Sequence, residues 1–157
     1  PHAQFRRQRQ MCIRDRDKEA RWSMMMASTE GAMAFSKGLG AVHSMSHALG
    51  ANQELRLHHG TLNAVILPAV LRFNQNHVGN KYSRIANAMG KDESINLANE
   101  IEKLNEKIGM PDSLSEMGVT EDMIPELIEH AMTDPSNITT PRVPNLAEWE
   151  KLFLDAL

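Results

Sequence analysis

The stretch from Lys37 to Asn74 constrains this chain most, because it gathers four of its seven histidines. They are His43, His47, His58 and His59. The first two stand four residues apart in a run of Ala, Val, Met and Leu that is typical of a helix ending at Gly50. That spacing places both imidazoles on one helix face, one turn apart. A polar loop over residues 52–56 then leads to a second, more apolar helix that begins at the His58–His59 pair. The pattern predicts a helix–loop–helix unit that brings imidazoles together.

The residues alone leave two interpretations of this cluster open. Imidazole nitrogen is a common ligand of transition metals, so the histidines could form a metal site. Histidines four residues apart also cap or pair on ordinary helix surfaces. His58 adjoins His59, and sequence neighbours rarely bind the same ion, so we expect His58 to be a loop residue. We expect His77 and His130, which lie outside the cluster, at the surface.

The order of residues across this stretch is more specific than the histidine spacing. It reads G-x-G-x-V-H-x-x-x-H-x-L-G, then a loop, then H-G-x-x-N-A-x-x-L-P. This pattern resembles the iron-containing (group III) alcohol dehydrogenases, and the resemblance extends over residues 18–157. It implies an all-α fold, a helical bundle similar to the C-terminal domain of that family, whose fold is like that of dehydroquinate synthase.

The resemblance also implies roles for three histidines. His43 and His59 match the family's metal ligands, and His47 matches the histidine that lines the cleft beside substrate and nicotinamide. The expected metal is Fe(II), with Zn(II) as the alternative, and the expected cofactor of the full-length enzyme is NAD or NADP. The implied reaction interconverts a small alcohol and its aldehyde or ketone by hydride transfer.

Parts of the family pattern have no counterpart here. The family's other two ligands, an Asp and a His on an earlier helix, are absent, and so is its nucleotide-binding domain. We therefore expect a C-terminal fragment of a longer enzyme that is inactive alone, with no cofactor-binding residue of its own. The loop between His47 and His59 is also longer than in common relatives, so the resemblance does not predict which substrate the enzyme prefers. DPSNITTPR resembles the family's D-x-C-x-x-T-N-P-R, with Ser136 in place of the Cys and Thr140 in place of the Asn.

Two other functions fit the histidines without the resemblance. One is a metal-dependent hydrolase or lyase that uses the same imidazoles. The other is a helical interaction module without chemistry, whose histidines decorate a groove.

Residues 1–16 differ in charge from the rest of the chain. They hold five of its 17 basic residues and one of its 20 acidic ones. A basic nucleic-acid arm, an Arg-rich transit segment and a non-native tail are the alternatives. We favour the last, because MCIRDR resembles translated sequencing adapter. We expect the helical, metal-binding domain to span residues 17–157.

Composition limits the classes of partner and the cellular compartment that we expect for this chain. The remainder of the chain is acidic, which argues against a nucleic-acid partner. No apolar run approaches the ~20 residues of a membrane span. The only cysteine, Cys12, permits no internal disulfide, which suits the cytoplasm. The sequence does not determine the oligomeric state of the full-length enzyme, for which a homo-oligomer is one alternative.

The remaining segments favour helix, with apolar residues at helical spacing and breakers between them. The pattern predicts helices over residues 17–36, 81–89, 93–108, 121–132 and 146–157. We expect Asp92, Thr120 and Asn145 to cap the last three of these helices at their N-termini. No segment has the alternation of a strand.

Overall fold

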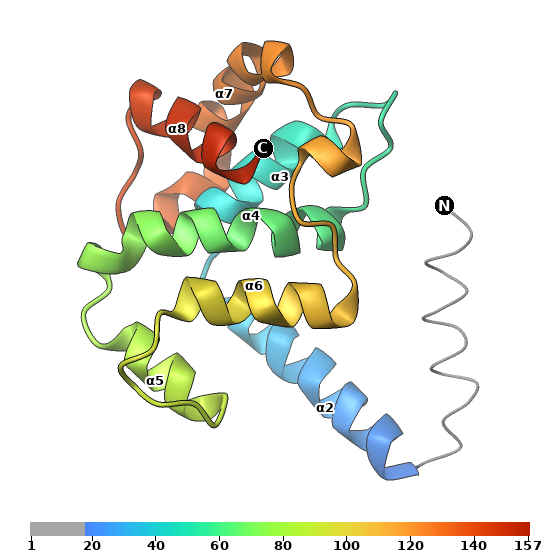
Figure 1. Ribbon diagram of the computed structural model, residues 1–157, viewed down its shortest axis with the longest axis vertical. Coiled ribbons are helices and arrows are strands. Elements are labelled where there is room, and N and C mark those ends of the chain that lie inside the picture. Colours follow the sequence, from blue (N-terminus) through green and yellow to red (C-terminus); the bar gives the residue numbers. More distant parts are fainter. Residues whose placement is uncertain (1–17) are drawn as a thin grey trace. The chain divides into compact units, whose positions relative to one another are not determined.

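The computed structural model describes residues 18–157, which contain helices and no strand (Figure 1). The all-α prediction is therefore confirmed. The tail predicted over residues 1–16 lies outside the described residues, and the extent of the domain, 17–157, stays a prediction. Helix α2 (Lys18–Phe35) belongs to one compact unit, and residues 39–157 form another. Within its own unit α2 leaves Trp22, Met24 and Phe35 exposed.

The second unit holds all the residues of the histidine stretch from position 39 onward. Its elements are α3 (Ala41–Gly50), α4 (His59–Asn74), η1 (Gln75–His77), α5 (Lys81–Ala88), α6 (Leu97–Ile108), η2 (Ser115–Met117), η3 (Glu121–Met123), α7 (Ile124–Thr133), η4 (Pro135–Thr139) and α8 (Leu146–Ala156).

The core of this unit lies where α3, α4, α7 and α8 meet. Met45, Leu62, Ile66, Trp149 and Phe153 are among its largest members, and each is at most 1% exposed. Burying a side chain of this size contributes about 1.5–3 kcal/mol. A smaller cluster, in which Leu71 meets Leu97, packs α6 along α4 (Figure 1). The buried faces of α3 and α4 thus fix how these two helices cross.

Pro68 lies inside α4, where its ring removes one backbone donor. The carbonyl of Ala64, four residues earlier, loses its helical partner for this reason. Asn105 of α6 replaces that partner, because its Nδ2 donates to the Ala64 oxygen at 2.7 Å. Pro68 therefore does not end α4. The Ala64 carbonyl that it leaves without a helical partner joins α4 to α6 through a hydrogen bond.

Two predicted helix starts are wrong. The helix predicted from residue 93 begins at Leu97, because Asn96 caps it by accepting from the Asn99 amide. Asp92 instead closes a turn by accepting from the Ser94 amide. The helix predicted from residue 121 begins as the 3-10 turn η3, and the side chain of Thr120 makes no cap. The predicted cap of the last helix is confirmed, since Asn145 and Glu148 form a capping box.

Candidate metal centre

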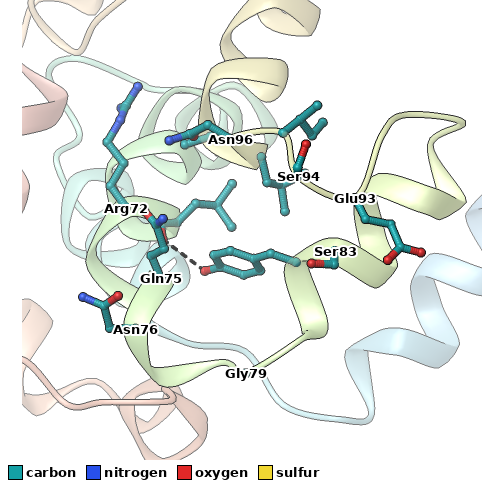
Figure 2. A pocket seen from close by; sticks show the side chains of 13 residues that line it. Arg72, Gln75, Asn76, Gly79, Ser83, Glu93, Ser94 and Asn96 are labelled. Carbon is teal, nitrogen blue, oxygen red and sulfur yellow. Dashed lines mark hydrogen bonds between the residues drawn. The ribbon is translucent and has the colours of Figure 1, made fainter.

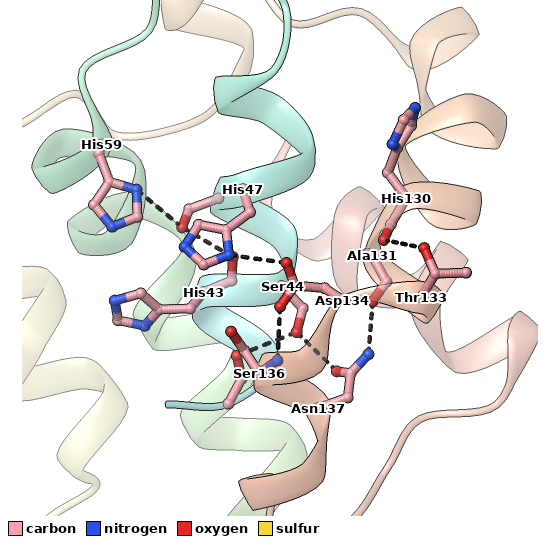
Figure 3. Close-up of polar contacts among 12 residues, drawn as sticks. His43, Ser44, His47, His59, His130, Ala131, Thr133, Asp134, Ser136 and Asn137 are labelled. Carbon is pink, nitrogen blue, oxygen red and sulfur yellow. Dashed lines mark hydrogen bonds and ion pairs between the residues drawn. The ribbon is translucent and has the colours of Figure 1, made fainter. Parts of the chain in front are cut away.

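Three of the four clustered histidines come together on the outer side of α3 and α4 (Figure 3). The ring centroids of His43, His47 and His59 lie 5.3, 5.4 and 5.7 Å apart in pairs. Two of the rings come from α3, one turn apart, and the third comes from the first residue of α4. Residues 51–58 therefore connect α3 and α4 so that their imidazoles come together, as the sequence pattern predicts. The three predicted site residues lie at one location.

His58 has a different role in this arrangement. It is the N-cap of α4, where its Nδ1 accepts a hydrogen bond from the Thr61 amide at 3.3 Å. The side chain fixes the start of α4 and with it the position of His59. His77 and His130 are exposed, as predicted.

The imidazoles of His43 and His59 converge on a single amide. Nδ2 of Asn63 lies 3.3 Å from Nε2 of His43 and 3.1 Å from Nε2 of His59. Both ring nitrogens thus direct a lone pair at one electropositive group. Oδ1 of the same amide is buried and has no hydrogen-bond partner. The two nitrogens form the kind of donor pair that Fe(II) or Zn(II) accepts, so these residues fit the metal that the resemblance implies.

The protonation of these rings favours ligation. Burial, followed by the nearby His59 and His47, lowers the pKa of His43. Burial, followed by His47 and His58, lowers the pKa of His59. An imidazole must be neutral to bind a metal ion, and both shifts favour the neutral ring at pH 7. The donor set is small, however, because within residues 18–157 no three His, Cys, Asp or Glu side chains are arranged to hold one metal ion.

His47 links the cluster directly to the C-terminal part of the chain. Its Nδ1 lies 2.9 Å from Oδ2 of Asp134, the N-cap of η4. Partial burial opposes ionisation of this carboxyl, but hydrogen bonds from Ser136 and His47 outweigh it and lower the pKa of Asp134. Sequence reasoning placed Asp134 in a family-like motif but did not connect it with His47.

A buried polar contact holds η4 against α3. The hydroxyl of Ser44 donates to Oδ1 of Asn137 at 2.8 Å, and Nδ2 of Asn137 donates to the Ala131 carbonyl at 2.6 Å (Figure 3). Ser44 is fully buried, and Asn137 is 7% exposed. No signal in the sequence identifies this pair, because its members are 93 positions apart.

A hollow of about 300 Å³ lies away from the histidines, between the end of α4, α5 and the start of α6 (Figure 2). Tyr82 lies in it and donates to the Leu71 carbonyl at 3.2 Å. Arg72 at its rim is already paired with Glu102 at 2.6 Å. This hollow contains no imidazole, and we assign the chemistry to the histidine cluster instead.

Comparison with known proteins places these features in a family. The model of the Fe-containing alcohol dehydrogenase family, C-terminal part, matches residues 5–157. The chain is 42% identical over 144 residues to a 4-hydroxybutyrate dehydrogenase of Cupriavidus necator, covering 87% of this chain and 38% of that protein. It is 36% identical over 146 residues to a lactaldehyde reductase of Escherichia coli K12, again covering 87% of this chain and 38% of that protein.

The structural comparison agrees. The crystal structure of a 1,3-propanediol oxidoreductase superposes with a TM-score of 0.70 and 33% identity, over 76% of this chain and 33% of that one. The chain therefore spans well under half the length of these relatives. No helix in the part of the chain that the structure describes is long and apolar enough to cross a membrane. From the matched family model, the sequence identities and the shared fold, the chain belongs to the iron-containing alcohol dehydrogenase family.

Proposed function

We propose that this chain forms the helical, metal-binding part of an NAD- or NADP-dependent alcohol dehydrogenase. The enzyme interconverts a small alcohol and its aldehyde or ketone. The observation that carries this proposal is the convergence of two imidazole nitrogens, from His43 and His59, on one amide group, that of Asn63. Family membership supports the same activity. The single Cys12 and the acidic remainder of the chain support a cytoplasmic enzyme without a nucleic-acid partner.

Each residue of the cluster has a distinct task in this proposal. His43 and His59 would hold Fe(II) or Zn(II) through their Nε2 atoms, and Asn63 would turn its amide away from them. The bound ion would polarise the substrate oxygen and so favour hydride transfer to or from the nicotinamide. His47 does not ligate the ion. It borders the substrate side of the cluster, where its ring accepts or returns the hydroxyl proton.

Two imidazoles make a weak metal site, so the chain alone should bind poorly. The test is a titration of the purified chain with Co(II) or Zn(II), followed by calorimetry and by the Co(II) absorption spectrum. We expect weak binding that His43→Ala or His59→Ala abolishes. The matched control is His77→Ala, which removes an exposed imidazole outside the cluster and should leave binding unchanged. Equal loss in all three variants would show that the binding is nonspecific.

Activity requires a nucleotide-binding part as well. Joining this chain to the N-terminal part of the C. necator relative should give alcohol-dependent reduction of NAD or NADP. His43→Ala and His59→Ala should abolish it, and His77→Ala should not. Turnover by the isolated chain, or a joined enzyme that tolerates both substitutions, would refute the proposed function.

A further inference from the structure

We propose that Asp134 is a positioning residue that holds the His47 ring in its Nδ1–H tautomer, with the bare Nε2 turned toward His43 and His59. The role given to His47 in turnover rests on the proposed function. The tautomer and ring orientation do not, because they are properties of this chain alone.

The geometry of the pair supports this assignment. Nδ1 of His47 and Oδ2 of Asp134 are 2.9 Å apart, which is the distance of a charge-assisted hydrogen bond. An ionised carboxylate can only accept, so the proton must lie on Nδ1. The neutral ring then carries its lone pair on Nε2. Figure 3 shows this second nitrogen on the side of the ring that faces the other two histidines.

The carboxylate is held in place from its own side. Oδ1 of Asp134 accepts from the Ser136 amide at 2.8 Å, which leaves Oδ2 for His47. The side chain of Asp134 is 15% exposed, whereas that of His47 is 42% exposed. The more buried and more constrained partner therefore orients the freer one.

The backbone around Asp134 is anchored to the helix that carries His47. Asn137, three residues after Asp134, is bonded to the buried hydroxyl of Ser44 at 2.8 Å. Ser44 and His47 are three residues apart on α3, so one face of this helix contacts η4 at two successive points. A shift of η4 relative to α3 would have to break both contacts.

An imidazole without this partner has no reason to keep its proton on Nδ1. An amide in place of the carboxylate can donate as well as accept, so it stabilises the other tautomer too. In the Nε2–H form, Nε2 of His47 would face His43 and His59 as a hydrogen-bond donor, whereas in the Nδ1–H form it faces them as an acceptor. In that form the lone pair is on Nδ1, so Nε2 could not accept a proton from a substrate hydroxyl.

The test is tautomer measurement by long-range ¹H–¹⁵N correlation spectra of the histidine-labelled chain at neutral pH. The His47 signals are identified with His47→Gln. In the unmodified chain we expect His47 to be the Nδ1–H tautomer, and in Asp134→Asn we expect the Nε2–H tautomer to become substantial. Asn is itself a good N-cap, so this variant keeps the η4 turn. Asp155→Asn, on the exposed side of α8, is the matched control and should change nothing.

A His47 ring that keeps the Nδ1–H tautomer in Asp134→Asn would overturn the proposal. Circular dichroism of each variant ensures that an unfolded chain is not mistaken for a changed tautomer, and Asp134→Glu serves as the second variant if Asn perturbs the fold. In the joined enzyme, Asp134→Asn should lower kcat, by no more than the about 10²–10⁴-fold that general acid–base catalysis contributes, with little change in KM. An inactive joined enzyme would count against the proposed function only, because the tautomer is read in the chain without metal or cofactor.

Discussion

The buried Ser44–Asn137 contact should have a measurable energetic role in this unit. Asn137→Ala removes the bond to the Ser44 hydroxyl and the 2.6 Å bond to the Ala131 carbonyl. The Ser44 hydroxyl keeps only a long contact of 3.4 Å with the Gly40 carbonyl. Each lost bond is worth about 1 kcal/mol, and a buried group left unpaired costs about 1–3 kcal/mol. We therefore expect Asn137→Ala to lower the free energy of unfolding by about 2–4 kcal/mol.

Ser44→Ala removes only the first of these bonds and should cost about 1–2 kcal/mol. The double variant should cost about 1 kcal/mol less than the two single costs together, because both single variants remove the same contact. Urea unfolding of the whole chain, followed by circular dichroism, measures all three. Asn76→Ala, at an exposed asparagine, is the control and should stay within about 0.5 kcal/mol of the unmodified chain. Strict additivity, or an Asn137→Ala cost no larger than the control, would show that the contact does not stabilise the unit.

Three further predictions concern other parts of the unit. Asn105→Ala leaves the Ala64 carbonyl beside Pro68 unpaired and should cost about 1–3 kcal/mol in urea unfolding, whereas a neutral result would mean that water replaces the amide. Asn145→Ala breaks the capping box of α8 and should cost about 1 kcal/mol, with Asn145→Asp as the variant that retains stability. Burial raises the pKa of Tyr82, the only tyrosine, to about 12, so its ultraviolet titration should show a midpoint well above that of the chain in denaturant, near 10. The folded chain keeps this proton to a higher pH than the unfolded one, so stability should fall as the pH rises from about 10 toward 12. The loss should be less than the ~2.7 kcal/mol of a two-unit shift, because the Tyr82 side chain is only partly buried. Coincident midpoints in the two titrations would contradict this.

The sequence determined the helices with strong local signals and the residues of the candidate centre. The spacing of His43 and His47 fixes two imidazoles on one face of a helix, whatever the rest of the chain does. The capping box at Asn145 is likewise local, since its two bonds close within four residues. Where two local signals compete, the sequence did not determine at which residue the helix begins. Asp92 and Asn96 both suit an N-cap, and α6 begins at the second because the buried Leu97 and Ala98 follow it.

Only the tertiary structure decided which side chains meet. The partner of His47 is 87 residues away, and the partner of Ser44 is 93 residues away. No periodicity relates such positions, because their distance depends on how α3, α4 and α7 pack around the core. The approach of Asn63 to His43 depends on the same packing, whereas its approach to His59, four residues earlier on α4, follows from the helix spacing. Local spacing sets which residues share a helix face, whereas the burial of Met45, Leu62 and Trp149 sets which faces come together.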